Sequence, residues 1–288
     1  MGWTVLVNAH AGSSPDADAV REALANAGVT GAVETVERGT DLEARATEGA
    51  IRGDALVAAG GDGTVSTVAA VAARHDVPFG VLPSGTLNHF ARDAKIPGSM
   101  AQAAEALTTP SSRRVDLGEI NGHTFINNAS LGMYPRIVWD REVEEQRGRP
   151  RWLAFAIALT RAWRRYRTLT VRLRVDGKDY VRRTPFVFIG NGRYEAEGLH
   201  LGGRAALDAG VLSIFVAPYC GRFDLLRLAA KAFAGQLEQE PKFESFEGRD
   251  VTIEPARRRI SVAIDGEVVM LATPIRCRIR PGALRLVG

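Results

Sequence analysis

Three glycines surround a single aspartate in the segment Gly60–Thr64, which follows the apolar run Ala55–Ala59. Glycines lack side chains, so backbone N–H groups in such a turn can approach an anion closely. The carboxylate of Asp62 is the type of oxygen ligand that Mg²⁺ takes between nucleotide phosphates. A helix predicted over Val65–Arg74 would add its N-terminal N–H groups. The spacing therefore predicts a phosphate-binding loop, and a plain strand-to-helix turn capped by Asp62 is the alternative.

A second turn of the same kind, Pro83–Arg92, follows the short apolar strand Pro78–Leu82. Gly85 permits an unusual backbone angle, while Thr86 and Asn88 supply a hydroxyl and an amide. Because the carboxyl ends of parallel strands meet at one edge of a sheet, we expect the two turns to lie together and to bind one ligand.

With three further segments, these turns make the sequence resemble the diacylglycerol kinase catalytic-domain family, which includes bacterial lipid kinases and sphingosine kinases. The matching segments occur in the family's order and are Asn8–Gly12, Gly60–Thr64, Pro83–Arg92, Asn191–Gly210 and Asp265–Glu267. Related ATP- or NAD-phosphorylating enzymes share the Gly-Gly-Asp-Gly element. The Pro-x-Gly-Thr-x-Asn loop and the late Asp-Gly-Glu motif resemble the lipid-kinase branch.

The resemblance implies an enzyme that uses ATP and Mg²⁺ to phosphorylate a hydroxyl of diacylglycerol or a similar lipid. It gives the catalytic Mg²⁺ to Asp62 and the role of general base to Glu267. By itself, Asp265-Gly266-Glu267 is a common hairpin turn. The positions that match the family's nucleotide contacts are Asn8, Thr35, Gly60, Gly61, Asp62, Gly63, Thr64, Gly85, Thr86 and Asn88.

Two sites near the loops depart from the family pattern. Ser66 and Thr67 replace an Asn-Glu pair that is common in relatives, and His89 stands where many relatives have aspartate. These departures leave open a nucleotide-binding module without transfer activity. Within the enzyme class, a kinase for a sphingoid base or another amphiphilic alcohol is the nearest rival. NAD kinase is a weaker alternative, because that chemistry does not need the Pro83–Arg92 loop.

A third departure concerns a structural metal. Many family members bind Mg²⁺ through Asp-Asp-Gly in the sandwich domain, but here Ala209 occupies the expected ligand position. Hard cations need oxygen ligands, which an alanine side chain does not provide. The backbone carbonyls of Ala206 and Val211 would remain, so we expect this second site to be lost.

The composition is that of a globular protein, with 288 residues, of which 45% are apolar and 24% charged. The net charge of +4 is too small to indicate nucleic-acid binding. Two cysteines argue against a disulfide framework, and the sequence shows neither a signal-peptide pattern nor an apolar run of the ~20 residues that span a bilayer. We therefore expect a cytoplasmic protein. The sequence leaves the oligomeric state open, a homodimer included.

The pattern of the chain changes near residue 115. Residues 1–115 alternate short apolar strands with helical stretches, which predicts a Rossmann-like parallel β/α nucleotide-binding domain. Residues 116–279 contain period-two segments, including His123–Asn128 and Asp179–Ile189, which predict an antiparallel β-sandwich for the lipid substrate. Helices are predicted near Arg151–Tyr166 and Phe223–Leu237. The resemblance implies that the last strand, near residues 280–288, returns to the first domain.

The predicted helix Arg151–Tyr166 has features of a membrane-surface helix. Its aromatic and aliphatic side chains recur at helical spacing, and three arginines are predicted to point the other way. This pattern leaves two interpretations open: packing of the apolar stripe on the sandwich, or peripheral contact with the inner face of the cell membrane. The predicted apolar face comprises Trp152, Phe155, Ala156, Leu159, Trp163 and Tyr166, and the arginines are Arg161, Arg164 and Arg165.

Overall fold

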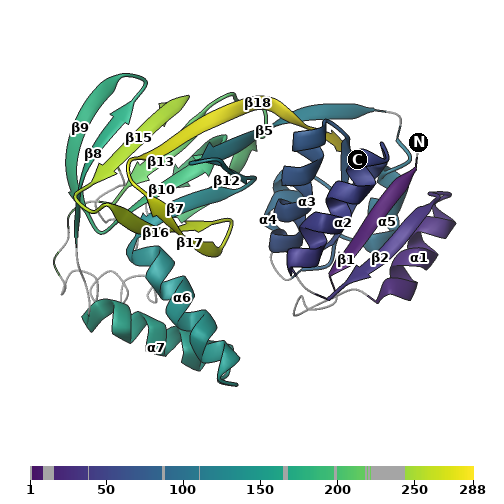
Figure 1. Ribbon diagram of the computed structural model, residues 1–288, viewed down its shortest axis with the longest axis horizontal. Coiled ribbons are helices and arrows are strands. Elements are labelled where there is room, and N and C mark those ends of the chain that lie inside the picture. The colour runs from purple at the N-terminus through teal and green to yellow at the C-terminus, as the bar shows by residue number, and fades with distance from the viewer. Residues whose placement is uncertain are drawn as a thin grey trace.

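A computed structural model of the chain describes residues 2–8, 16–37, 39–85, 88–109, 111–164, 168–197, 200–217, 219, 221 and 244–288. Figure 1 shows two lobes joined by two long strands, β5 (Ser112–Ile120) and β18 (Ile275–Val287). The N-terminal lobe is a parallel β/α structure and the C-terminal lobe is built from antiparallel sheets. The predicted fold class is therefore confirmed.

The N-terminal lobe contains a parallel sheet in the order β2-β1-β3-β4. Its strands are β1 (Trp3–Asn8), β2 (Gly31–Val36), β3 (Ala55–Gly60) and β4 (Pro78–Pro83). All residues of β3 and β4 are buried, as expected for parallel strands covered on both faces. Helices α2 and α3 pack together on one face, and α1 and α5 on the other (Figure 1). These helices are α1 (Ala17–Asn26), α2 (Gly39–Ile51), α3 (Asp62–His75) and α5 (Met100–Ala106).

The last strand ties the lobes together. One end of β18 pairs in parallel with β4 through Arg285 and Leu286, while β5 pairs with β18 in antiparallel fashion along most of its length. A single ten-stranded sheet therefore continues from the N-terminal lobe into the C-terminal one. The boundary between residues 115 and 116 stays a prediction, and it falls inside β5.

The C-terminal lobe packs part of this long sheet against a second sheet. The long sheet continues as β18-β15-β8-β9, with β6 added to β5, and the second sheet has the order β14-β13-β10-β7-β16-β17. Side chains of both sheets, among them Leu173, Ile189, Ile214 and Ile253, are fully buried between them. The strands are β6 (His123–Phe125), β7 (Asn128–Gly132), β8 (Leu169–Val175), β9 (Lys178–Thr184), β10 (Phe186–Asn191), β13 (Leu212–Val216), β14 (Glu244–Gly248), β15 (Asp250–Pro255), β16 (Arg259–Ile264) and β17 (Glu267–Ala272).

Two segments predicted as single strands are each divided in the structure. Asp179–Ile189 breaks at Pro185, where the chain passes from the long sheet to the second one, because proline has no N–H to give to a ladder. His123–Asn128 breaks at Ile126 and Asn127, because their N–H groups donate to the carboxylate of Asp265. A further pair, β11 (Arg193–Glu197) and β12 (His200–Ala206), forms a separate ribbon.

A helical hairpin, α6 (Met133–Gln146) and α7 (Arg151–Arg164), projects from the second sheet (Figure 1). The sequence predicted α7 but not α6. The buried carboxylate of Glu144 on α6 forms ion pairs with Arg161 of α7 at 2.8 Å and with Arg149 of the connecting turn at 2.7 Å. Burial would raise the pKa of Glu144, but the Arg161 hydrogen bond and the nearby arginine charges outweigh burial and lower it. This carboxylate fixes the two helices to each other.

The orientation of α7 differs in part from the predicted one. Ala154 and Ala158 are buried, whereas Trp152 is 72% exposed and Leu159 is 40% exposed. Arg161 does not point away from the protein, because it is paired with Glu144 and, at 3.6 Å, with Asp140. The apolar stripe at Trp152, Ala156 and Leu159 is thus exposed and does not cover the sandwich. Tyr166, Arg165, the Phe155 side chain and the predicted helix Phe223–Leu237 lie outside the described residues.

Candidate functional site

The first glycine loop lies between β3 and α3. Gly61 is extended and precedes Asp62, the first residue of α3, so the loop's carboxylate stands at the positive end of the helix. Thr64 is buried, and its hydroxyl accepts a hydrogen bond of 3.1 Å from the Asn8 side-chain amide at the end of β1. A Cβ at Gly60 would lie 2.6 Å from that hydroxyl, so only glycine fits there. The structure therefore brings Asn8 and the Gly60–Thr64 loop together.

The second loop packs directly on the first. A Cβ at Gly85 would lie 2.6 Å from Cα of Gly61, and the Ser84 N–H donates to the Gly60 carbonyl at 3.3 Å. Asn88 closes the loop: its Oδ1 accepts from the Gly85 N–H at 2.9 Å, and its Nδ2 donates to the Gly85 carbonyl at 2.6 Å. The two turns lie together as the sequence predicted. Thr86 lies outside the described residues.

Asp62 also contacts the short helix that follows the second loop, α4 (His89–Asp93). The Phe90 N–H points to Oδ1 of Asp62 at 3.4 Å, a long contact. Asp62 is half-buried. Glycine N–H groups, a helix N-terminus and a carboxylate together form a cradle suited to phosphate oxygens and one hard cation.

Glu267 faces the same region from the other lobe. It is exposed at the start of β17 and, with Gly63 of the first loop, lines a cleft of about 230 Å³. Ser66 and Arg74 of α3 and His123 of β6 also line this cleft. The structure thus places the predicted base and the first glycine loop on one cleft.

Asp265 anchors the turn that carries Glu267. It has φ +46° in a two-residue hairpin between β16 and β17, which is the conformation that Asp-Gly favours. Its carboxylate accepts the N–H groups of Ile126, Asn127 and Asn128 at 2.8–3.0 Å and the Ser66 hydroxyl at 2.5 Å. Burial raises the pKa of the Asp265 carboxyl, and these hydrogen bonds oppose the rise. The Ser66 departure therefore forms a direct bond between the lobes.

Two other residues singled out in the sequence, Thr35 and His89, lie on the surface. Thr35 is exposed on the edge strand β2, beside Val7 of β1. His89, which replaces an aspartate of relatives, lies on the surface, where its Nδ1 contacts the Arg92 guanidinium at 2.9 Å. Neither position supplies a carboxylate to the cleft.

The stretch Ala206–Val211 is a poor fit for a second metal ion. The buried Asp116 carboxylate nearby accepts the N–H groups of Gly210 at 2.6 Å and Gly282 at 2.8 Å, one on each oxygen. The Val211 carbonyl accepts the Gly192 N–H. Across the described ranges, no cluster of three or more His, Cys, Asp or Glu side chains could hold a metal. The loss of this site stays a prediction that the local bonding supports.

We expect the melting temperature of the nucleotide-free protein to stay within about one degree when millimolar Mg²⁺ is added. A divalent ion bound at 100 times its Kd would stabilise the fold by about 2.7 kcal/mol, which is several degrees. Thermal melts with Mg²⁺ and with EDTA measure the difference. The control is Ala209→Asp, which returns a carboxylate to the loop. A rise of several degrees in the unsubstituted protein would contradict the prediction.

Sequence reasoning missed the residues that join the lobes. Asp93, Asp116 and Arg204 are buried or nearly so, and each binds across segments far apart in the chain. Asp116 interrupts an apolar strand and Arg204 follows two glycines in a run of small residues. A charged residue in such a context was the available signal, but its partner could not be read from the sequence.

The comparisons with known proteins agree with this geometry. Residues 2–120 match the diacylglycerol kinase catalytic domain, and residues 134–288 match the YegS C-terminal NAD kinase beta sandwich-like domain. A probable lipid kinase YegS-like of Pseudomonas fluorescens is 32% identical over 236 residues, covering 80% of this chain and 76% of that protein. A diacylglycerol kinase of Mycobacterium tuberculosis is 30% identical over 242 residues, covering 81% and 76%.

A solved diacylglycerol kinase structure from Bacillus anthracis has the same fold. It superposes with a TM-score of 0.73 at 24% identity, covering 99% of this chain and 96% of that one. At this identity the likeness shows the fold alone, whereas the domain matches and the sequence relatives show descent. The chain belongs to the diacylglycerol kinase-like lipid kinase family, with a catalytic domain followed by a YegS-type β-sandwich.

Proposed function

We propose that the protein is an ATP-dependent lipid kinase that transfers the γ-phosphoryl group to a hydroxyl of diacylglycerol or a similar lipid. The observation that carries this proposal is that two separate pockets adjoin at Val269 of β17. Glu267 lines the polar cleft beside the first glycine loop, and Val268 and Met270 line a larger pocket on the same strand. Val269 lines both. A hydroxyl held at Glu267 would leave its hydrophobic chain room in the larger pocket.

The nucleotide side of this proposal rests on the two glycine loops. Asn8, Gly60–Thr64, Gly85 and Asn88 would surround the phosphates, and Asp62 would hold Mg²⁺ together with phosphate oxygens and water. The bound ion would neutralise charge on the transferred group. One carboxylate is enough for this purpose, because Mg²⁺ usually keeps several waters. Glu267 would accept the proton of the lipid hydroxyl. The role of Thr86 and Thr35 in nucleotide contact remains a proposal from the family pattern.

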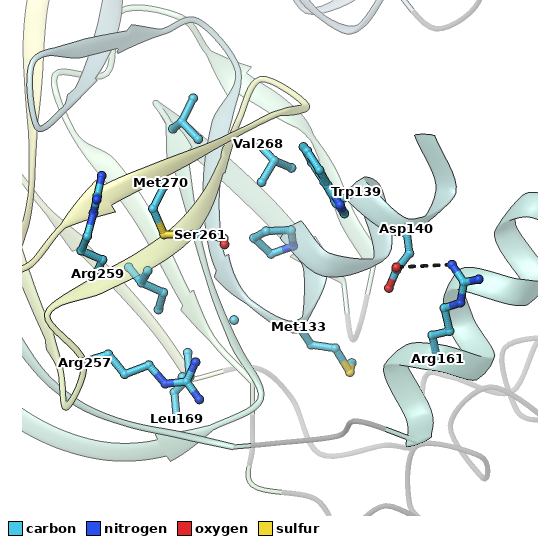
Figure 2. Close-up of a pocket in the computed structure, with 14 residues that line it drawn as sticks. Met133, Trp139, Asp140, Arg161, Leu169, Arg257, Arg259, Ser261, Val268 and Met270 are labelled. Carbon is cyan, nitrogen blue, oxygen red and sulfur yellow. Dashed lines mark ion pairs between the residues drawn. The ribbon is translucent and has the colours of Figure 1, made fainter. Parts of the chain in front are cut away.

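The lipid side rests on the pocket shown in Figure 2. It measures about 570 Å³ and lies between α6 and the strands β16 and β17. Its walls include Met133, Leu169, Val268 and Met270, and its edge carries the exposed Trp139. Arg257 and Arg259 line it on one side, and Arg161 also lines it but is paired with Asp140 (Figure 2). Apolar walls with a cationic rim suit an acyl chain entering from an anionic lipid surface.

The decisive assay uses [γ-³²P]ATP with a panel of lipids in mixed micelles and chromatographic identification of the product. We expect a labelled phospholipid from diacylglycerol or a related acceptor. A product from a sphingoid base alone would favour the rival kinase. Bound ATP with no labelled product from any acceptor would favour a nucleotide-binding module, and phosphorylated NAD would indicate NAD kinase.

We also propose that the α6–α7 hairpin contacts the membrane surface. None of the helices in the described part of the chain is long and apolar enough to cross a bilayer. The exposed Trp152 lies at the start of α7, directly after the turn that carries Arg147 and Arg149, and the exposed Leu159 lies further along the same helix. Indole rings favour the headgroup boundary, and each arginine near an anionic surface adds about 1 kcal/mol.

Trp152→Ser is expected to weaken binding to vesicles that contain anionic lipid by at least about tenfold. Burying roughly 100 Å² of the indole is worth about 2.5 kcal/mol, and its exposed position means that the melting temperature should hardly change. Vesicle sedimentation at two salt concentrations measures the effect. Ile51→Ser is the matched control, because Ile51 is also 72% exposed but lies on α2 in the other lobe. Equal binding by the two variants would remove α7 from the membrane contact.

A further inference from the structure

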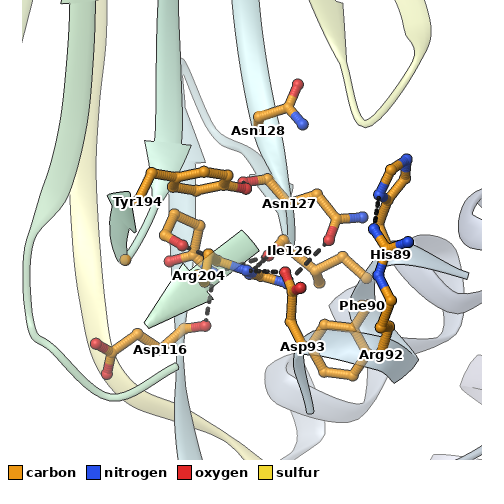
Figure 3. A network of polar contacts seen from close by, with 12 residues as sticks. His89, Phe90, Arg92, Asp93, Asp116, Ile126, Asn127, Asn128, Tyr194 and Arg204 are labelled. Carbon is orange, nitrogen blue, oxygen red and sulfur yellow. Dashed lines mark hydrogen bonds and ion pairs between the residues drawn. The ribbon is translucent and has the colours of Figure 1, made fainter. Parts of the chain in front are cut away.

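Arg204 of β12 lies in the joint between the lobes, and its side chain has no exposed surface (Figure 3). Nε donates to Oδ2 of Asp93 on α4 at 2.7 Å. Nη1 donates to the Ile126 carbonyl at 2.5 Å, and Nη2 donates to Oδ1 of Asn127 at 3.0 Å. The guanidinium thus bonds an acid of the N-terminal lobe and the β6–β7 connection with one planar group.

Two aromatic rings hold the guanidinium from its sides. Its central carbon lies 5.7 Å from the Phe90 ring centroid and 5.9 Å from that of Tyr194. The Tyr194 hydroxyl donates to the Asn127 carbonyl at 2.9 Å. Burial raises the pKa of Tyr194 to about 12, so this hydroxyl keeps its proton at neutral pH. The two rings therefore limit the orientation of the Arg204 guanidinium, and Asp93 is the acid that pairs with its charge.

The bonds around Arg204 extend to both halves of the proposed site. On one side, Asp93 shares α4 with Phe90, whose N–H points to Asp62. On the other side, residues 126–128 hold the Asp265 carboxylate, two residues before Glu267. The Asp265 carboxylate also accepts a hydrogen bond from the Ser66 hydroxyl of α3, the helix that begins with Asp62. The contacts form a closed ring that passes through both lobes.

We infer that Arg204 is a positioning residue that sets the placement of the Glu267 turn relative to the Asp62 loop. This inference rests on the proposed function for its kinetic consequences. The planar guanidinium fork fixes the positions of its acceptors relative to one another, because its N–H groups point in fixed directions. A lysine ammonium cannot reproduce this geometry. Removing the fork would leave the Asp93 carboxylate and the Asn127 side-chain oxygen without this donor in a buried space. A displacement of ~1 Å between reacting groups can cost about 10²-fold in rate.

The kinetic test uses Arg204→Ala, with Arg193→Ala as the matched control. Arg193 lies on the neighbouring strand β11, where its ion pair with Glu247 is exposed. We expect kcat of Arg204→Ala to fall at least tenfold, with the lipid KM within threefold, and the control to stay within twofold of wild type. Millimolar guanidinium should restore at least fivefold of the kcat of Arg204→Ala and should not change the control. Unchanged kcat in folded Arg204→Ala overturns the inference, as does a loss that guanidinium cannot restore.

A second arm does not depend on kinase activity. Hydrogen exchange of the amides in residues 89–94 and 126–128 should be at least tenfold faster in Arg204→Ala than in wild type, while exchange in α1 should be equal. If Arg204→Ala does not fold, the same comparison is made with Arg204→Lys, which keeps the charge without the fork. Wild-type exchange rates in both segments overturn the inference. A wild-type protein that phosphorylates no acceptor overturns the proposed function instead, and this second arm still decides the role of Arg204.

Discussion

Asp62→Asn is expected to abolish phosphoryl transfer, with kcat reduced at least about 10³-fold. Asparagine has nearly the same shape and can still accept the long contact from the Phe90 N–H. It lacks the negative charge that would hold a cation beside the phosphates, and charge stabilisation of this kind contributes several kcal/mol to the transition state. A loss of about 4 kcal/mol corresponds to the stated 10³-fold. Single-turnover assays with labelled ATP and a range of Mg²⁺ concentrations measure it.

The control for this variant is Asp41→Asn, which removes an acid from the first turn of α2 in the same lobe. Both substitutions lose the favourable interaction of a carboxylate with a helix N-terminus, about 0.3–1 kcal/mol. A decrease in melting temperature shared by both variants is thus a helix effect, and loss of turnover in Asp62→Asn alone is the effect of the site. If Asp62→Asn kept more than a tenth of wild-type kcat, the metal assignment to Asp62 would be wrong.

The loops and turns of the site that are determined by neighbouring residues in the chain were predictable from the sequence. Gly60–Thr64 and Gly85–Asn88 each follow a buried parallel strand, and strands of one parallel sheet end at a common edge. Once β/α alternation was recognised, the meeting of the two loops followed. The turn Asp265-Gly266 was equally local, because it is a hairpin dipeptide between two apolar runs.

The parts that depend on contacts between distant segments were not predictable. Apolar and polar residues are poorly separated on helix α6. The sequence pattern therefore gives little indication that this helix packs against β7 and β16. Arg161 was expected to point away from the protein because helical spacing puts it opposite the apolar stripe, yet it forms an ion pair with Glu144 on another helix. Arg204 and Asp93 are 111 residues apart, and neither carries a local pattern that names the other. Sequence periodicity predicts which face of a helix or strand is apolar, but it does not predict which distant charged residues form ion pairs.

Glu267→Gln is expected to lower kcat by roughly 10²-fold or more while nucleotide binding remains unchanged. Glutamine keeps the size of the side chain but cannot take a proton from the lipid hydroxyl, and loss of a general base costs about 10²–10⁴-fold. Glu267 is exposed at the start of β17, so the variant should fold and melt as wild type does. Steady-state kinetics with the best acceptor, and ATP binding measured by calorimetry, give the two quantities.

Two further variants separate the role of base from that of anchor. Glu254→Gln removes an exposed carboxylate from β15 of the same lobe and should keep full kcat. Asp265→Asn keeps Glu267 but weakens the bonds from Ser66 and residues 126–128, so it should lower both kcat and the melting temperature. Glu267→Gln should lower kcat alone, because its side chain carries none of these bonds. Near-normal kcat in Glu267→Gln would mean that the hydroxyl loses its proton to another group, and the cleft beside α3 would then hold the acceptor in a different orientation.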